Sequence, residues 1–161
     1  MVADALTGPV HVRFDVRRDG TLVAEDDLPP ASQWPGSLDE AYGRIRISAP
    51  GIPDVTPEDE LLALVTNVCF RLVSAAARQG HAVISYFASY GYFRVDIEAS
   101  LARISGDAVP DVRVPALDLL EGLVECGRRY LRWRSETMTS IPDELVVEQA
   151  VAEDAVRNFR N

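Results

Sequence analysis

The sequence predicts an α+β fold: an antiparallel sheet of about five to six strands, with two to three helices packed mainly on one face. Three observations support this class. Short segments between turn signals alternate apolar and polar residues, as strands do. One segment carries an apolar stripe at helical spacing. The predicted hairpins imply antiparallel pairing, and helices would cover the one apolar face of such a sheet. The length of 161 residues fits one domain, residues 1–161.

The N-terminal third is predicted to form three strands and a loop. Apolar and polar residues alternate from Val10 to Val16, as in a half-buried strand. Asp19-Gly20 is a two-residue hairpin turn signal, so residues 9–25 should form a hairpin. Residues 26–41 contain three prolines and should form a loop. The alternation around Ile45 and Ile47 predicts a third short strand.

A long helix is predicted over about 57–79. Thr56 can cap it, Pro57 suits the first helical position, and acidic residues follow where the positive end of the helix dipole lies. A wide apolar stripe at 3.6-residue spacing begins at Leu61. Gly80 is a typical left-handed C-terminal stop.

The second half is predicted to contain a hairpin over about 82–104, a short strand near Val112, and helices over about 116–134 and 142–159. A three-residue hairpin loop ending at Gly91 would place Phe87 opposite Phe93 and keep one face apolar. The same register would oppose Tyr86 and Arg94. The last helix has few large apolar residues, so we expect it to pack loosely or to contact a partner.

The charge and composition exclude several function classes. The chain has no lysine, so a P-loop or a pyridoxal phosphate Schiff base has no lysine to use. Its net charge of −9 argues against nonspecific binding to nucleic acid or anionic membranes. No apolar run approaches a membrane span of about 20 residues, and Met1–Asp4 shows no signal-peptide pattern.

The two cysteines indicate a reducing compartment. Cys69 and Cys126 each lie within an apolar helical pattern, which favours two small buried side chains over a disulfide or reactive pair. We therefore expect a cytoplasmic protein.

No catalytic, cofactor-binding or metal-ligating residues can be assigned, so we expect a protein that is not an enzyme. His11 and His81 have no second ligand at metal-binding spacing, and no nucleophile motif occurs. Asp96 and Glu98 point to one side of a strand about 7 Å apart, a separation that suits paired catalytic carboxylates. A solvated strand face is the alternative interpretation.

The candidate residues for partner binding are aromatic or charged. Tyrosine and arginine are favoured at interface centres, and the acidic segment 25–60 could attract a basic partner. Ordinary cross-strand packing and a solubilising surface are the alternatives, and Trp34 could instead plug the core. The candidates are Tyr86, Tyr90, Tyr92, Arg94, Asp96, Glu98, Trp34, Asp26 and Asp27.

Three functions follow from these expectations. The first is an acidic binding protein, most concretely an immunity or antitoxin-type inhibitor that occludes a basic bacterial toxin or effector. The second is a secretion chaperone or assembly adaptor that dimerises and binds an extended peptide. The third is a small-ligand-binding α+β domain with Asp96, Glu98 or His11 in a pocket. The first two need a protein partner and no cofactor.

Overall fold

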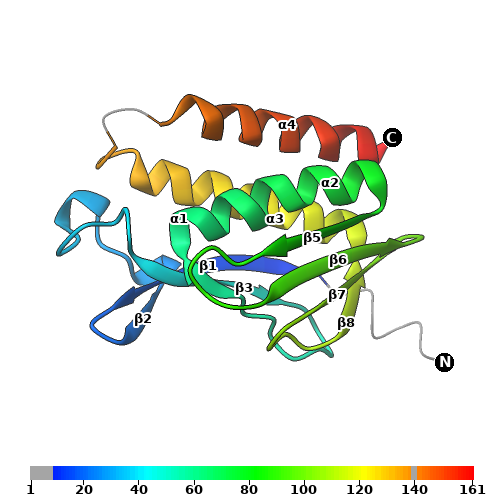
Figure 1. Cartoon of the computed structure of the whole chain (residues 1–161), viewed down its shortest axis with the longest axis horizontal. Helices are drawn as coiled ribbons and strands as arrows, with labels where there is room; N and C mark the ends of the chain where they lie inside the picture. Colours follow the sequence, from blue (N-terminus) through cyan, green and yellow to red (C-terminus); the bar gives the residue numbers. More distant parts are fainter. Residues whose placement is uncertain (1–8, 139–140) are drawn as a thin grey trace.

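The computed structural model describes residues 9–138 and 141–161. It has two four-stranded antiparallel sheets, with helices stacked on one side of them (Figure 1). The α+β class is therefore confirmed, although eight strands replace the five to six expected. One region interpreted in the sequence, Met1–Asp4, lies outside the described residues.

The first sheet holds the N-terminal strands in the order β2-β1-β3-β4. Asp19 and Gly20 both have positive φ, 48° and 80°, as the predicted two-residue hairpin turn requires. Phe14 lies opposite Ile45 on the buried face. The strands are β1 (His11–Arg18), β2 (Thr21–Ala24), β3 (Tyr42–Ser48) and β4 (Glu58–Glu60).

The second sheet continues the chain in simple sequence order, β5-β6-β7-β8, so that β5 and β8 are its edges. Phe93, Val95 and Ile104 are fully buried beneath the helices. The strands are β5 (His81–Ser85), β6 (Tyr92–Glu98), β7 (Leu101–Gly106) and β8 (Val112–Pro115).

Helices cover the sheets in two tiers. A continuous helix runs from Leu61 to Gln79 and comprises α1 (Leu61–Leu64), a π-helical segment η4 (Val65–Arg71) and α2 (Leu72–Gln79). It packs beside α3 (Ala116–Arg134), where an added Cβ at Gly127 would lie only 2.7 Å from the Phe70 ring. The last helix, α4 (Asp143–Arg160), packs on these helices away from the sheets (Figure 1).

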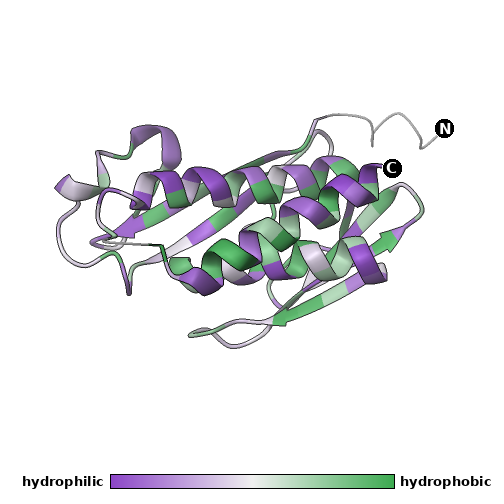
Figure 2. Ribbon diagram, turned by 90° about the horizontal axis from the view of Figure 1, so that it is seen from above, coloured by the Kyte–Doolittle hydropathy of each residue, from purple (hydrophilic) through white to green (hydrophobic). Residues whose placement is uncertain are grey.

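One hydrophobic core joins both sheets and all of these helices. Seen from above, hydrophobic and hydrophilic positions alternate along the helices, as amphipathic packing requires (Figure 2). The helix Leu61–Gln79 reaches the length and composition of a membrane span, with a mean hydropathy of 1.5, although polar residues interrupt its apolar run. Half of that window is buried inside the protein, and this is consistent with the core helix of a soluble protein.

The long helix begins later than the sequence predicts. Its first residue is Leu61, and residues Glu58–Glu60 form β4 instead of the first helical turn. Thr56 and Pro57 are therefore not its cap and first position. Pairing with the free edge of β3 competes with helix formation in this segment: the main-chain N–H of Ile45 donates to the Pro57 carbonyl at 3.1 Å.

The register predicted for the β5–β6 hairpin is wrong by three residues. Phe93 lies opposite Ile84 instead of Phe87, and Arg94 lies opposite Val83 instead of Tyr86. The connecting loop is six residues long, Tyr86–Gly91, instead of three. We call this segment the β5–β6 loop.

Candidate functional site

The β5–β6 loop is held by one buried carboxylate. Asp59 is 1% exposed and accepts three main-chain N–H bonds, from Phe87 at 2.5 Å, Ala88 at 2.9 Å and Ser89 at 3.2 Å. Hydrogen bonds to an ionised acceptor are stronger than neutral ones. The carboxylate of β4 therefore fixes the main chain of a loop nearly thirty residues away in sequence.

The other end of the loop is fixed by Asp107. Its side chain accepts from the Tyr92 N–H at 3.3 Å, and its own N–H donates to the Tyr92 carbonyl at 3.1 Å. Gly91 has a φ of 114°, and a Cβ there would lie 2.9 Å from the Asp107 side chain. Glycine is thus needed at this position for both conformation and space.

This ordered loop exposes large apolar side chains. Tyr90 is fully exposed, and Phe87 is 69% exposed. Tyr92 and Val83 lie on the adjoining strands and are 41% and 52% exposed. A fixed main chain that presents aromatic rings to solvent is the arrangement expected of a preorganised contact surface.

A cleft opens on each side of the β5–β6 loop. One, of about 320 Å³, lies between Phe87, the start of α1 and the start of α4, with Leu62, Ala63 and Leu145 among its lining. We call this the Phe87 cleft.

The other cleft, of about 360 Å³, is lined by Tyr86, Tyr90, Glu58 and Asp107, and we call it the tyrosine cleft. Burial and then the negative charges of Asp59 and Asp107 raise the pKa of Tyr86 to about 12. Tyr86 is therefore a neutral phenol at physiological pH, and its surroundings carry negative charge.

The strand residues predicted for partner binding lie on the outer face of the second sheet. Arg94 is bound to Asp96 through its Nε, which donates at 2.8 Å. Arg113 is bound to Glu98 at 2.9 Å. Each of these carboxylates is paired with an arginine, so the outer face of the second sheet contributes little to the negative charge of the protein surface.

The remaining candidates are separated from the loop. Trp34 is only 8% exposed and packs edge to face on Trp133, so it is not available as an exposed anchor. Asp26 forms an ion pair with Arg13, and Asp27 is exposed in a short 3-10 turn. Several carboxylates of the acidic segment 25–60 thus form ion pairs with arginines of the same chain, as Glu25, Asp39 and Glu58 do as well.

The structure does not gather the residues required for a small-ligand pocket. His11 lies on β1 in the first sheet and lines a cleft that includes neither Asp96 nor Glu98. Both carboxylates are on β6 in the second sheet. Within residues 9–138 and 141–161, no group of three His, Cys, Asp or Glu side chains is arranged to hold a metal ion.

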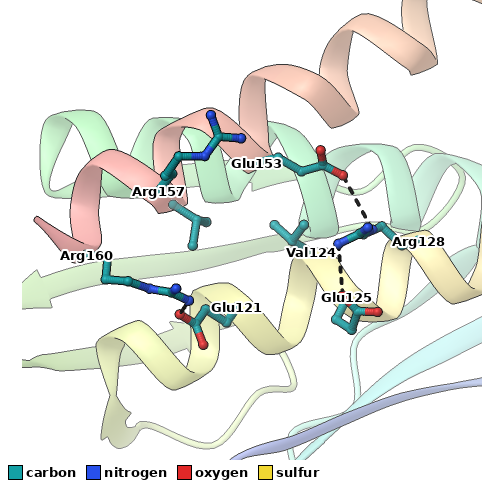
Figure 3. A pocket seen from close by; sticks show the side chains of 8 residues that line it. Glu121, Val124, Glu125, Arg128, Glu153, Arg157 and Arg160 are labelled. Atoms are coloured by element: carbon teal, nitrogen blue, oxygen red, sulfur yellow. Dashed lines mark hydrogen bonds and ion pairs between the residues drawn. The ribbon is translucent and has the colours of Figure 1, made fainter.

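A groove of about 530 Å³ lies between α3 and α4 (Figure 3). Its charged walls are occupied by ion pairs of Arg160 with Glu121 and of Arg128 with both Glu125 and Glu153. Three arginines face three glutamates among the residues that line it. This balance gives the groove no preference for a charged ligand, and we favour the β5–β6 loop as the functional site.

Of the residues predicted from the sequence, Tyr86 and Tyr90 lie in the β5–β6 loop and Tyr92 begins β6. The sequence does not predict the roles of Asp59, which supports the loop instead of starting a helix, and of Phe87, whose ring is exposed instead of buried. No local signal connects Asp59 to the loop.

Comparisons of the chain with protein-family models, with curated proteins and with solved structures found no match.

Proposed function

We propose that the chain is a non-enzymatic binding protein whose β5–β6 loop docks on a basic protein partner. The observation that carries this proposal is the Asp59 carboxylate, which orders the main chain of a loop whose Phe87 and Tyr90 rings remain in solvent. Ordering the loop before binding removes part of the entropic cost of association. Aromatic side chains in such positions commonly dominate the binding energy.

The charge around the loop supports a basic partner. Glu58, Glu60 and Asp107 line its two clefts, where Arg71 is the basic residue among the lining. The whole chain carries a net charge of −9. Opposite charges accelerate encounter, and this acceleration declines with salt.

In its most concrete form, this protein is an immunity or antitoxin-type inhibitor that covers the active surface of a basic bacterial toxin or effector. We propose a cytoplasmic location, which the free cysteines Cys69 and Cys126 favour. The test is affinity capture from the source organism with the tagged full chain, compared with an F87S/Y90S variant. V147S is the matched control, because Val147 is an exposed apolar residue on α4.

The proposal expects one basic protein to be captured by the wild-type chain and by V147S, and to be lost with F87S/Y90S. The wild-type chain should also suppress the activity or toxicity of that purified protein. Equal capture by all three chains would refute the role of the loop. If the captured protein keeps its full activity when bound, the proposed inhibition is refuted, whereas the proposed binding role of the loop stands.

One observation favours a second function, that of an assembly adaptor or secretion chaperone. β5 is an edge strand next to the β5–β6 loop, and its Val83 is 52% exposed. An extended peptide could pair with such an edge by adding a strand. This alternative predicts a stable homodimer in sedimentation experiments without partner, and a monomer at high concentration would count against it.

A further inference from the structure

We propose that the tyrosine cleft is a subsite for a cationic side chain of the partner, with arginine preferred over lysine. This inference rests on the proposed function and adds the chemistry of the group that enters beside the loop. The cleft lies between the segment that leads into β4 and the turn that follows β7. Its volume of about 360 Å³ is within the range of small-ligand sites, roughly 300–1,000 Å³.

Two aromatic rings contribute to the walls of the cleft. Tyr90 is fully exposed, so a ring face is free for a ligand. Tyr86 is partly buried and packs against the core, so its ring is fixed in place. A guanidinium group over such a ring gains a cation–π interaction, and its planar shape also allows stacking.

Two carboxylates line the same cleft. Glu58 belongs to β4, and Asp107 follows β7 and holds the main chain of Tyr92. No basic side chain is among the described residues that line the cleft. Burial is the largest cause of the raised pKa of Tyr86, and the negative charges of Asp59 and Asp107 raise it further, which agrees with a negative potential at this position.

The combination of rings and carboxylates defines the ligand. An apolar side chain would displace water from the Glu58 and Asp107 carboxylates without donating a hydrogen bond in return, and an anion would be repelled. Arginine offers a flat face to the tyrosine ring and several N–H donors to the carboxylates, whereas the ammonium group of lysine is a compact, strongly hydrated charge.

A titration followed by NMR tests the subsite without the unidentified partner. The probe is N-acetyl-arginine amide added to the isotope-labelled full chain, and N-acetyl-citrulline amide is the uncharged probe of nearly the same shape. We expect saturable shifts of the amide signals of Glu58, Ser89 and Asp107 with the arginine probe, about fivefold weaker binding with the lysine analogue, and no saturation with citrulline.

Two variants and two controls locate the binding. An exposed carboxylate contact or cation–π contact contributes only modestly to affinity. E58Q and Y90A should therefore each weaken binding of the arginine probe by about fivefold. Glu58 also pairs with Arg17 at 3.4 Å, so R17Q is the matched control. It retains the carboxylate and should bind as tightly as the wild type or more tightly. D27N removes an exposed carboxylate elsewhere and should have no effect.

Equal shifts with the arginine and citrulline probes, or binding unaffected by E58Q and Y90A, would overturn the subsite. Capture of a partner that depends on Phe87 and Tyr90, together with no response to the arginine probe, would refute this inference and leave the proposed function standing. Saturable arginine binding with partner capture unaffected by F87S/Y90S would instead refute the proposed function.

Discussion

The support that Asp59 gives to the β5–β6 loop makes one prediction that follows directly from the geometry. In D59N the side-chain oxygen can still accept from Ala88 and Ser89, whereas the amide nitrogen cannot accept from Phe87. A hydrogen bond to a charged group contributes about 1.5–3 kcal/mol. We expect D59N to lower the free energy of unfolding by about 2 kcal/mol, which corresponds to a fall of about 4–8 °C in Tm for a chain of this size.

Asp59→Ala removes all three acceptor contacts and should cost more, about 3–4 kcal/mol, because water can hydrate only part of the freed loop. Urea unfolding followed by circular dichroism measures both values. Hydrogen exchange should show lost protection at the amides of Phe87, Ala88 and Ser89. D54N is the control, since Asp54 is exposed and should change stability by less than about 0.5 kcal/mol. If D59N is as stable as D54N and the three amides remain protected, the reasoning fails.

Three further predictions concern packing and pH. G127A should destabilise the protein by about 1–3 kcal/mol in urea unfolding, because a Cβ would lie 2.7 Å from the Phe70 ring; an unchanged midpoint would contradict this. R134A should cost about 3 kcal/mol, because Arg134 is 1% exposed and bonds the Leu38 carbonyl and the Tyr130 hydroxyl, whereas R132A at an exposed position should cost little. The folded protein raises the pKa of Tyr86 to about 12, so the unfolded chain loses this proton first, near pH 10. Stability should therefore decline between about pH 10 and pH 12, and Y86F should remove that part of the decline measured by urea unfolding.

The sequence predicted those elements whose signals are local. The Asp19-Gly20 turn requires positive φ at both positions, which these residue types tolerate, and the structure has it. The helix predicted over 116–134 matches α3, because its apolar spacing extends over several turns. The buried state of Cys69 and Cys126 also followed from the apolar patterns around them.

The sequence identified Tyr86, Tyr90 and Tyr92 as candidates, but it could not predict how the site is built, because that depends on contacts between distant segments. Thr56-Pro57-Glu58-Asp59 has the composition of a helix start, and that local preference is overridden by pairing of β4 with β3. Asp59 then binds a loop 28 to 30 residues further along the chain. The loop it binds is six residues long, and the hairpin register differs from the predicted one, so Phe87 is exposed instead of buried.

The most direct test of the central claim is the affinity of the captured, purified partner for the wild-type chain, F87S/Y90S and V147S, measured by isothermal titration calorimetry. If the β5–β6 loop is the anchor, F87S/Y90S should bind at least about 30-fold more weakly, as the loss of 2 kcal/mol at a binding hot spot implies, while V147S binds as the wild type does. Equal dissociation constants for all three chains would contradict the account.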